Sequence, residues 1–201
     1  MITPEIVSCP DHVFTCLGDE APDFLKVFRA PSGTVTKRGP SLALFCSAKA
    51  PAGILLAIHD LAQQWRQGSH VIISGFHSPV EQEAFEILLR GPGQVIYCPA
   101  RGLPKRFPPA WREALEAGRL TILSPFPDSV RRATKETAIY RNRIVAALAD
   151  TVLVAYAHPG SSTEQLAQEV LAWGKPIYTI NQTTGQRLID FGVLVWESNY
   201  E

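Results

Sequence analysis

The sequence predicts an α/β fold: a doubly wound, mostly parallel sheet of the extended Rossmann-like kind, with helices on both faces. Two observations predict it. From residue 41 onward, apolar runs of four to six residues alternate with amphipathic stretches of about 10–15 residues, a pattern typical of repeated βαβ units. The apolar runs are not interrupted by polar residues at every second position, as is usual for parallel strands buried on both faces.

The elements follow in order from residue 41. Residues 42–46 and 71–74 are apolar and predict strands. Between them, apolar residues at helical spacing predict a helix over residues 53–67. The next helix, residues 79–90, begins at a proline, which is tolerated there because its missing N–H has no partner in the first turn. Residues 94–98 predict the third strand.

The second half continues the alternation. The same criteria predict helices over residues 108–117, 135–149 and 162–173, a short helical turn over 186–191, and strands over 120–123, 151–155, 176–180 and 193–196. We expect the last strand at the edge of the sheet. Gly118 and Gly174 follow two of these helices, as is common at helix C-termini.

The first 40 residues differ from the rest in being rich in Pro, Gly, Asp and Thr. They predict an N-terminal extension or linker, and residues 41–201 predict one Rossmann-like ligand-binding domain. Within the extension, residues 23–29 predict a helix and residues 30–40 a loop.

Composition excludes several classes of protein. The 201 residues include 19 Lys and Arg and 19 Asp and Glu, so the formal net charge is +0. The chain is therefore not a strongly basic nucleic-acid binder, and nucleic-acid binding needs a local basic patch. No membrane-spanning stretch or secretory leader is recognisable, so we expect a cytoplasmic protein without a membrane partner. Four scattered cysteines predict neither a disulfide framework nor a metal site, and we expect no cofactor.

In doubly wound sheets, ligands bind outside the carboxyl ends of the strands. The strand over residues 71–74 runs into a turn that contains Ser74, Gly75 and Ser78. Gly75 lets the backbone approach a ligand closely, and the serines with the free N–H groups of the next helix would hold an anion. The alternative is a tight turn in which Ser78 only caps the helix.

The strand over residues 151–155 runs into a second turn of this kind. Gly160, Ser161, Ser162 and Thr163 precede or begin the next helix and would form a phosphate cradle. The alternative is that Ser162 or Thr163 only caps that helix.

Arg141, Asn142 and Arg143 form the most informative segment. Arginines suit phosphate because the guanidinium donates two parallel hydrogen bonds. Two arginines at i and i+2 do not share a helix face, so one would face the crevice while the other pairs with a carboxylate. A solvated basic helix start is the alternative.

Further basic residues lie in predicted loops or shortly before the Arg-Asn-Arg segment. Together they would give a neutral protein a positive mouth, although most loop charges are simply solvated. These residues are Lys37, Arg38, Lys49, Arg101, Lys105, Arg106, Arg131, Arg132 and Lys135.

The segment over residues 140–148, Tyr-Arg-Asn-Arg-Ile-Val-Ala-Ala-Leu, closely resembles the RNRIIAGLS segment of the DNA-processing protein A (DprA/Smf) family. Ser74-Gly75 with Glu81 resembles its SGxAxGID segment. Residues 151–163 and 185–192 resemble its later strand-and-serine stretch and its GtnxLIxxGA segment. The order and spacing agree from about residue 42 to 196.

The resemblance implies an extended Rossmann domain that binds single-stranded DNA in a basic pocket, forms a homodimer and helps to load a recombinase. Lys49 lies in the loop where the family has a Gly-Ser-Arg-like turn. The complete set of candidate phosphate-binding residues is Lys49, Ser74, Gly75, Ser78, Arg141, Asn142, Arg143, Gly160, Ser161, Ser162 and Thr163.

Two alternatives stay open. The crevice would instead bind a nucleotide, in a sensor or in a nucleoside monophosphate hydrolase of the Lonely Guy type within the wider superfamily. His77, Glu81 and Glu164 are then the acid–base candidates, although no residue is assigned a catalytic role. The second alternative is a scaffold whose crevice has lost its ligand.

Overall fold

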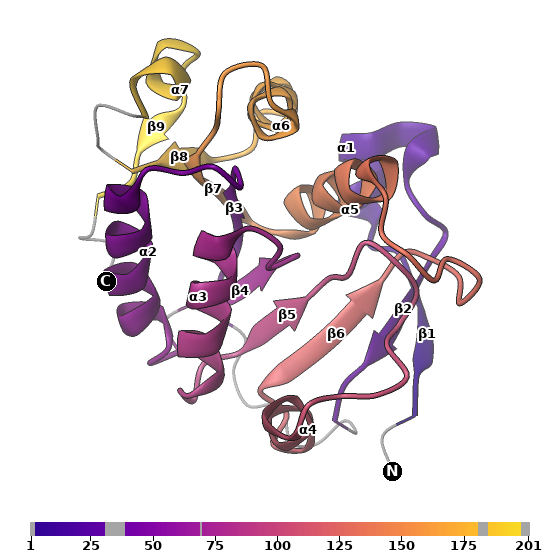
Figure 1. Ribbon diagram of the computed structural model, residues 1–201. Helices are drawn as coiled ribbons and strands as arrows, with labels where there is room; N and C mark the ends of the chain where they lie inside the picture. Colours follow the sequence, from indigo (N-terminus) through magenta and orange to yellow (C-terminus); the bar gives the residue numbers. More distant parts are fainter. Residues whose placement is uncertain (1–2, 31–38, 69, 181–184, 198–201) are drawn as a thin grey trace.

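The structure, a computed structural model, describes residues 3–30, 39–68, 70–180 and 185–197. Within these residues the strands form one nine-stranded sheet, in the order β1-β2-β6-β5-β4-β3-β7-β8-β9 (Figure 1). Neighbouring strands from β6 to β9 in this order are parallel. The β1–β2 and β2–β6 pairs are antiparallel. The predicted α/β fold with a mostly parallel sheet is confirmed.

The strands are β1 (Glu5–Ser8), β2 (Phe24–Phe28), β3 (Ser41–Cys46), β4 (Val71–Ser74), β5 (Val95–Tyr97), β6 (Leu120–Ser124), β7 (Thr151–Tyr156), β8 (Ile177–Thr179) and β9 (Leu194–Val195). The helices are α1 (Asp11–Leu17), α2 (Ala52–Trp65), α3 (Pro79–Leu89), α4 (Pro109–Glu116), α5 (Lys135–Leu148), α6 (Ser162–Ala172) and α7 (Gln186–Asp190), with a short 3-10 turn over Gly18–Glu20. The elements predicted after residue 41 are all present, and β9 lies at the sheet edge.

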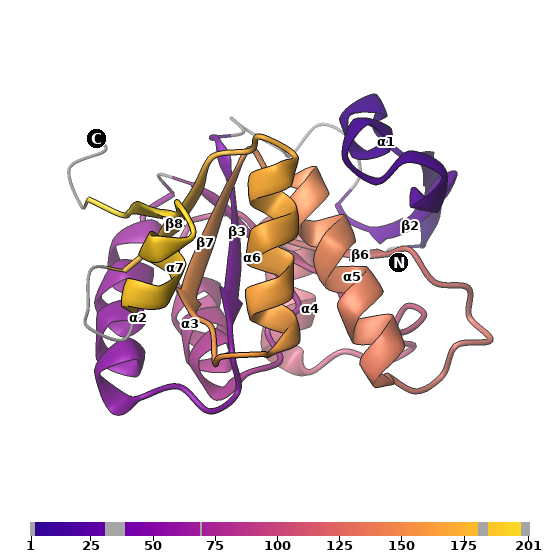
Figure 2. The same cartoon turned by 90° about the horizontal axis from the view of Figure 1, so that it is seen from above.

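Helices cover both faces of the sheet. Figure 2 shows α1, α5 and α6 on one face and α2, α3 and α4 on the other. The buried side chains accordingly form two apolar clusters, one on each side of the strands. Leu42 and Leu44 belong to one cluster, and Ala43 and Phe45 to the other, because side chains alternate along β3.

The strand order reverses between β3 and β7. From β3 the chain proceeds through β4, β5 and β6 on one side, and then crosses to β7, β8 and β9 on the other. The loops that leave β3 and β7 therefore diverge, and the crevice between them is where this class of fold binds ligands.

The opposite ends of β3 and β7 are tied together by one carboxylate. Asp150 Oδ2 accepts hydrogen bonds from the backbone N–H and the hydroxyl of Ser41, at 2.8 and 2.7 Å. The Asp150 N–H donates in return to Ser41 Oγ at 2.9 Å. These bonds hold the two central strands in register.

The predicted helix over residues 23–29 is wrong, because this segment is β2. Its neighbours in the sheet decide the outcome. Leu25 and Val27 are buried at alternate positions, and the strand pairs with β1 on one side and β6 on the other. A period of two suits a strand, and seven residues are too few for a helical period to be distinguished from it.

The first 30 residues extend the sheet by two strands, and α1 packs against α5. Most of the loop predicted over residues 30–40 lies outside the described residues. No helix in the described ranges is long and apolar enough to cross a membrane.

Candidate functional site

Two adjoining hollows, here called the crevice, lie at the carboxyl ends of the central strands. The first has a volume of about 510 Å³ and lies beside the β4–α3 turn, the end of β5 and the first half of α5. The second, of about 290 Å³, lies between the β3–α2 loop and the start of α6. Residues that line both hollows are His77, Ala138, Arg141, Asn142 and Ser162.

The floor of the crevice is a buried arginine. Arg141 is 3% exposed, and its Nη1 donates a 2.6 Å hydrogen bond to the carbonyl oxygen of Cys98. Its guanidinium lies directly on Gly75, where a Cβ atom would be only 1.3 Å from Nη1 and 1.8 Å from Cζ. Gly75 is therefore needed for space, since its φ lies outside the left-handed region.

The turn after Gly75 is built by local bonds. Ser74 is fully buried, and its hydroxyl accepts the N–H of Phe76 at 3.1 Å. Phe76 has a φ of 44°, a left-handed conformation that is uncommon for a bulky residue and is often found at functional sites. Its ring stacks on Phe85 with centroids 4.4 Å apart, which holds the turn against α3.

Glu81 connects two walls of the crevice. Its side chain is buried, and Oε1 accepts the N–H of Cys46, at the end of β3, at 2.8 Å. Oε2 accepts the N–H groups of His77 and Ser78, at 2.7 and 3.3 Å. Burial raises the pKa of the Glu81 carboxyl, while the three N–H donors and Arg141 oppose that rise. Ser78 caps α3 in return by accepting the N–H of Glu81.

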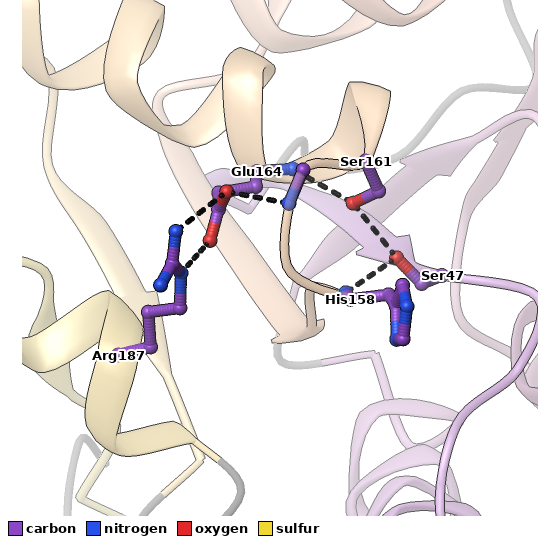
Figure 3. Close-up of polar contacts among 6 residues, drawn as sticks. Ser47, His158, Ser161, Glu164 and Arg187 are labelled. Atoms are coloured by element: carbon purple, nitrogen blue, oxygen red, sulfur yellow. Dashed lines mark hydrogen bonds and ion pairs between the residues drawn. The ribbon is translucent and has the colours of Figure 1, made fainter.

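The β7–α6 turn is a second polar network, drawn in Figure 3. Ser161 caps α6 by accepting the Glu164 N–H at 3.2 Å, and its hydroxyl lies 3.3 Å from that of Ser47. Ser47 in turn accepts the N–H of His158 at 3.0 Å. The hydroxyl of Ser161 thus serves the turn as well as the crevice wall.

Glu164 closes this network at the base of α6. It accepts the N–H of Gly160 at 2.8 Å and forms an ion pair with Arg187 of α7 (Figure 3). The Arg187 guanidinium, together with the Gly160 N–H, lowers the pKa of the Glu164 carboxyl. The carboxylate is therefore engaged away from the crevice.

A pH-dependent contribution to stability follows for Glu164. Because its pKa is lower in the folded chain, the carboxylate stabilises the fold above its unfolded pKa of about 4.3, and this stabilisation is lost as the pH falls through the folded value. We expect Glu164→Gln to be less stable than the wild-type chain at pH 7. The difference should shrink below about pH 4, as measured by urea unfolding across pH. A difference that stays constant down to pH 2–3, roughly, would contradict this cause.

The crevice is positively charged. Among the described residues that line it, four carry a cationic side chain: Lys49, Arg101, Lys135 and Arg141. Its only lining carboxylate in the described ranges is Glu81, which already accepts three backbone N–H groups. In a chain with a net charge of +0, this is the local basic patch that nucleic-acid binding requires.

The structure brings most of the predicted site residues together. Those that line the crevice are Lys49, Gly75, Ser78, Arg141, Asn142, Ser161, Ser162 and Thr163. Ser74 lies beneath the turn, and Gly160 lies beside the crevice with its N–H bonded to Glu164. Lys37 and Arg38 lie outside the described residues.

Arg143 does not line the crevice. Its guanidinium forms ion pairs with Glu20, at 2.6 Å, and with Glu169 of α6, at 2.7 Å. These bonds join α5 to the 3-10 turn after α1 and to α6. Of the two arginines, Arg141 forms the crevice floor and Arg143 pairs with carboxylates, as the spacing i and i+2 requires.

Sequence reasoning missed Tyr97 and His158 as crevice residues, and it named Arg101 and Lys135 only among the further basic residues, outside the set of phosphate-binding candidates. A signal was available for Tyr97, His158 and Arg101. Tyr97 ends β5, while Arg101 and His158 follow the parallel strands β5 and β7. The same strand-end rule that selected Gly75 applies to them.

The crevice offers no thiolate or metal centre among the residues that the structure describes. Burial raises the pKa of the Cys46 thiol to about 12, so the thiol is protonated at neutral pH. All four cysteines, which lie in the described ranges, are unpaired, and no group of three or more potential metal ligands occurs there.

Residues 26–190, most of the chain, match the sequence pattern of the DNA recombination-mediator protein A family. The chain belongs to this family. The resemblance to DNA-processing protein A is thereby confirmed, and it extends from β2 to α7.

Solved structures with the same fold include two members named DNA processing protein A. The one from Helicobacter pylori has a TM-score of 0.75 and 20% identity, over 95% of this chain and 89% of that chain. The one from Streptococcus pneumoniae also has a TM-score of 0.75 and 20% identity, over 96% and 70%. The molybdenum cofactor binding protein from Rippkaea orientalis is more distant, with a TM-score of 0.55 and 17% identity, over 81% and 92%. No curated protein matches the chain in sequence.

Proposed function

We propose that this member of the DNA recombination-mediator protein A family binds the phosphates of single-stranded DNA in the crevice, as an accessory to DNA processing or recombination. The observation that carries the proposal is the convergence of Lys49, Arg101, Lys135 and Arg141 around a space whose one described carboxylate is saturated by backbone donors. With four cationic side chains and one carboxylate among its described lining residues, such a site attracts an anion.

Arg141 supplies a donor that lacks an acceptor. A guanidinium carries five N–H bonds, and the Cys98 carbonyl oxygen takes one of them. Arg141 Nε is buried, and no acceptor in the described part of the chain bonds to it. A buried unpaired donor costs about 1–3 kcal/mol. Arg141 lines both hollows, where its positive charge favours an anion.

The start of α6 supports the same ligand. Ser162 and Thr163 occupy the first turn of the helix and line the crevice. The first N–H groups of a helix have no partner within it and favour an anion. Family membership supports this ligand too, and the Helicobacter pylori structure is described for its single-stranded DNA binding mode.

The test is binding of a fluorescent oligothymidylate across a salt series. We expect Lys49→Gln and Lys135→Gln each to weaken binding and to reduce the slope of log K against log salt by about 0.7, because one phosphate contact to a single strand is lost. Arg112→Gln is the matched control, since Arg112 is exposed on α4 and does not line the crevice. No complex with the wild-type chain at low salt would refute the proposal.

Arg143→Gln separates the two arginines. We expect it to leave the salt slope unchanged, because Arg143 pairs with Glu20 and Glu169 outside the crevice. If Arg143→Gln reduced the slope of log K against log salt as much as Lys49→Gln does, Arg143 would contact phosphate and this assignment would be wrong.

The nucleotide alternative shares the crevice but has no observation that favours hydrolysis. Glu81 is saturated by N–H groups, and Glu164 is paired with Arg187. Homodimer formation, contact with a recombinase and a cytoplasmic location remain predictions that rest on the family resemblance and the composition.

A further inference from the structure

A second basic surface adjoins the crevice. It consists of exposed cations in the β5–α4 loop and in the segment that leads from β6 into α5, and we call it the basic ledge. Its members are Arg101, Lys105, Arg106, Arg131, Arg132 and Lys135. Arg101 and Lys135 also line the first hollow, so the ledge is continuous with the crevice.

The two loops of the ledge are fastened to each other. The Gly102 N–H donates to the carbonyl oxygen of Val130 at 2.9 Å. The Ser124 hydroxyl donates to the carbonyl oxygen of Arg101 at 2.7 Å. A Cβ atom on Gly102 would lie 2.8 Å from the carbonyl oxygen of Pro127, so the loops touch backbone to backbone. Figure 1 shows both loops on the β6 side of the molecule.

The outer end of the ledge is held as well. Phe107, next to Arg106, is half-buried and packs edge-on against Phe28 of β2, with centroids 5.3 Å apart. Like charges are thus kept close on a fixed surface rather than spread over free loops.

Few carboxylates balance the charge of the ledge cations in the described part of the chain, although Lys135 interacts electrostatically with Glu136. None of the six forms an ion pair with a carboxylate of the described residues, whereas Arg90, Arg143 and Arg187 elsewhere all do. Two carboxylates lie close to the ledge in sequence: Asp128 is neutralised by Lys26 at 3.0 Å, and Glu136 is exposed on α5. The ledge therefore keeps a net positive charge, which costs stability unless a polyanion covers it.

We propose that a DNA strand held in the crevice leaves it across the basic ledge, toward β6 and β2, and not toward β8 and β9. On the β8 side, Arg187 of α7 is already paired with Glu164. The inference rests on the proposed function and adds to it the direction of the strand and a second set of phosphate contacts outside the crevice.

The test compares two triple variants of equal charge on oligothymidylates of about 5 and about 20 nucleotides across a salt series. The ledge variant is Arg106→Gln, Arg131→Gln and Arg132→Gln, which leaves every crevice-lining residue in place. The control variant is Arg66→Gln, Arg90→Gln and Arg112→Gln, three arginines outside both the ledge and the crevice.

We expect the ledge variant to bind the long strand at least about tenfold more weakly at low salt, with a slope smaller by about 2, and to bind the short strand as the wild-type chain does. The control variant should bind both strands normally. Equal effects of the two variants, or a wild-type slope that does not grow with strand length, would overturn the inference while the proposed function stands. Failure of the wild-type chain to bind either strand would overturn both.

Discussion

Gly75→Ala is expected to destabilise the chain by about 3 kcal/mol or more and to abolish DNA binding. The new Cβ atom would lie 1.3 Å from Arg141 Nη1, so the guanidinium must leave its place or the β4–α3 turn must move. The first change breaks the bond from Arg141 to the Cys98 carbonyl oxygen, and the second displaces the crevice wall that contains Gly75. Urea unfolding measures the first effect, and oligothymidylate binding the second.

A double-mutant cycle identifies the clash as the cause. In the Arg141→Ala background the guanidinium is absent, so Gly75→Ala should cost at least 1 kcal/mol less, roughly, than in the wild-type background. Gly160→Ala is a second control: Gly160 has a φ of 73° and open space around it, so only backbone strain of about 1 kcal/mol is expected. Additive effects at positions 75 and 141 would contradict the explanation.

Glu81→Ala is expected to cost about 3 kcal/mol or more, because three backbone N–H groups lose their acceptor at once. These groups belong to Cys46 at the end of β3 and to His77 and Ser78 at the start of α3. Both walls of the second hollow should loosen, so faster amide exchange is expected at Cys46 and His77, together with weaker DNA binding.

Glu83→Ala is the matched control for this prediction. Glu83 lies two residues further along α3, where its partly exposed carboxylate bonds to His59 at 3.2 Å. A surface pair of this kind contributes about 0–1 kcal/mol. If Glu81→Ala were as mild as Glu83→Ala, the carboxylate of Glu81 would not be what joins the two walls.

The alternation of apolar runs and amphipathic stretches predicted the helices and strands after residue 41 because each follows from local periodicity. Residues 23–29 were predicted wrongly because β2 becomes a strand through pairing with β1 and with β6, and β6 lies far away in sequence. Local pattern cannot report pairing of that kind.

The candidate site shows the same division. The strand-end rule found Gly75, Ser78 and Ser162 without knowledge of their contacts. The roles of Arg141 and Arg143 follow from which helix face meets the sheet, and the role of Glu81 follows from its contact with Cys46, 35 residues away. Those facts exist only once the chain is folded.

The position of β3 between β4 and β7 has a consequence for biosynthesis. Ser41 and Asp150, which hold these two strands together, are 109 residues apart. At about 5–20 residues per second, translation separates the emergence of β3 from that of β7 by roughly 5–20 s. During this interval β3 has one open edge, a liability in a nascent chain. The crevice takes one wall from the β3 side and the other from the turn between β7 and α6, so the ligand site cannot be complete until that turn has been synthesised.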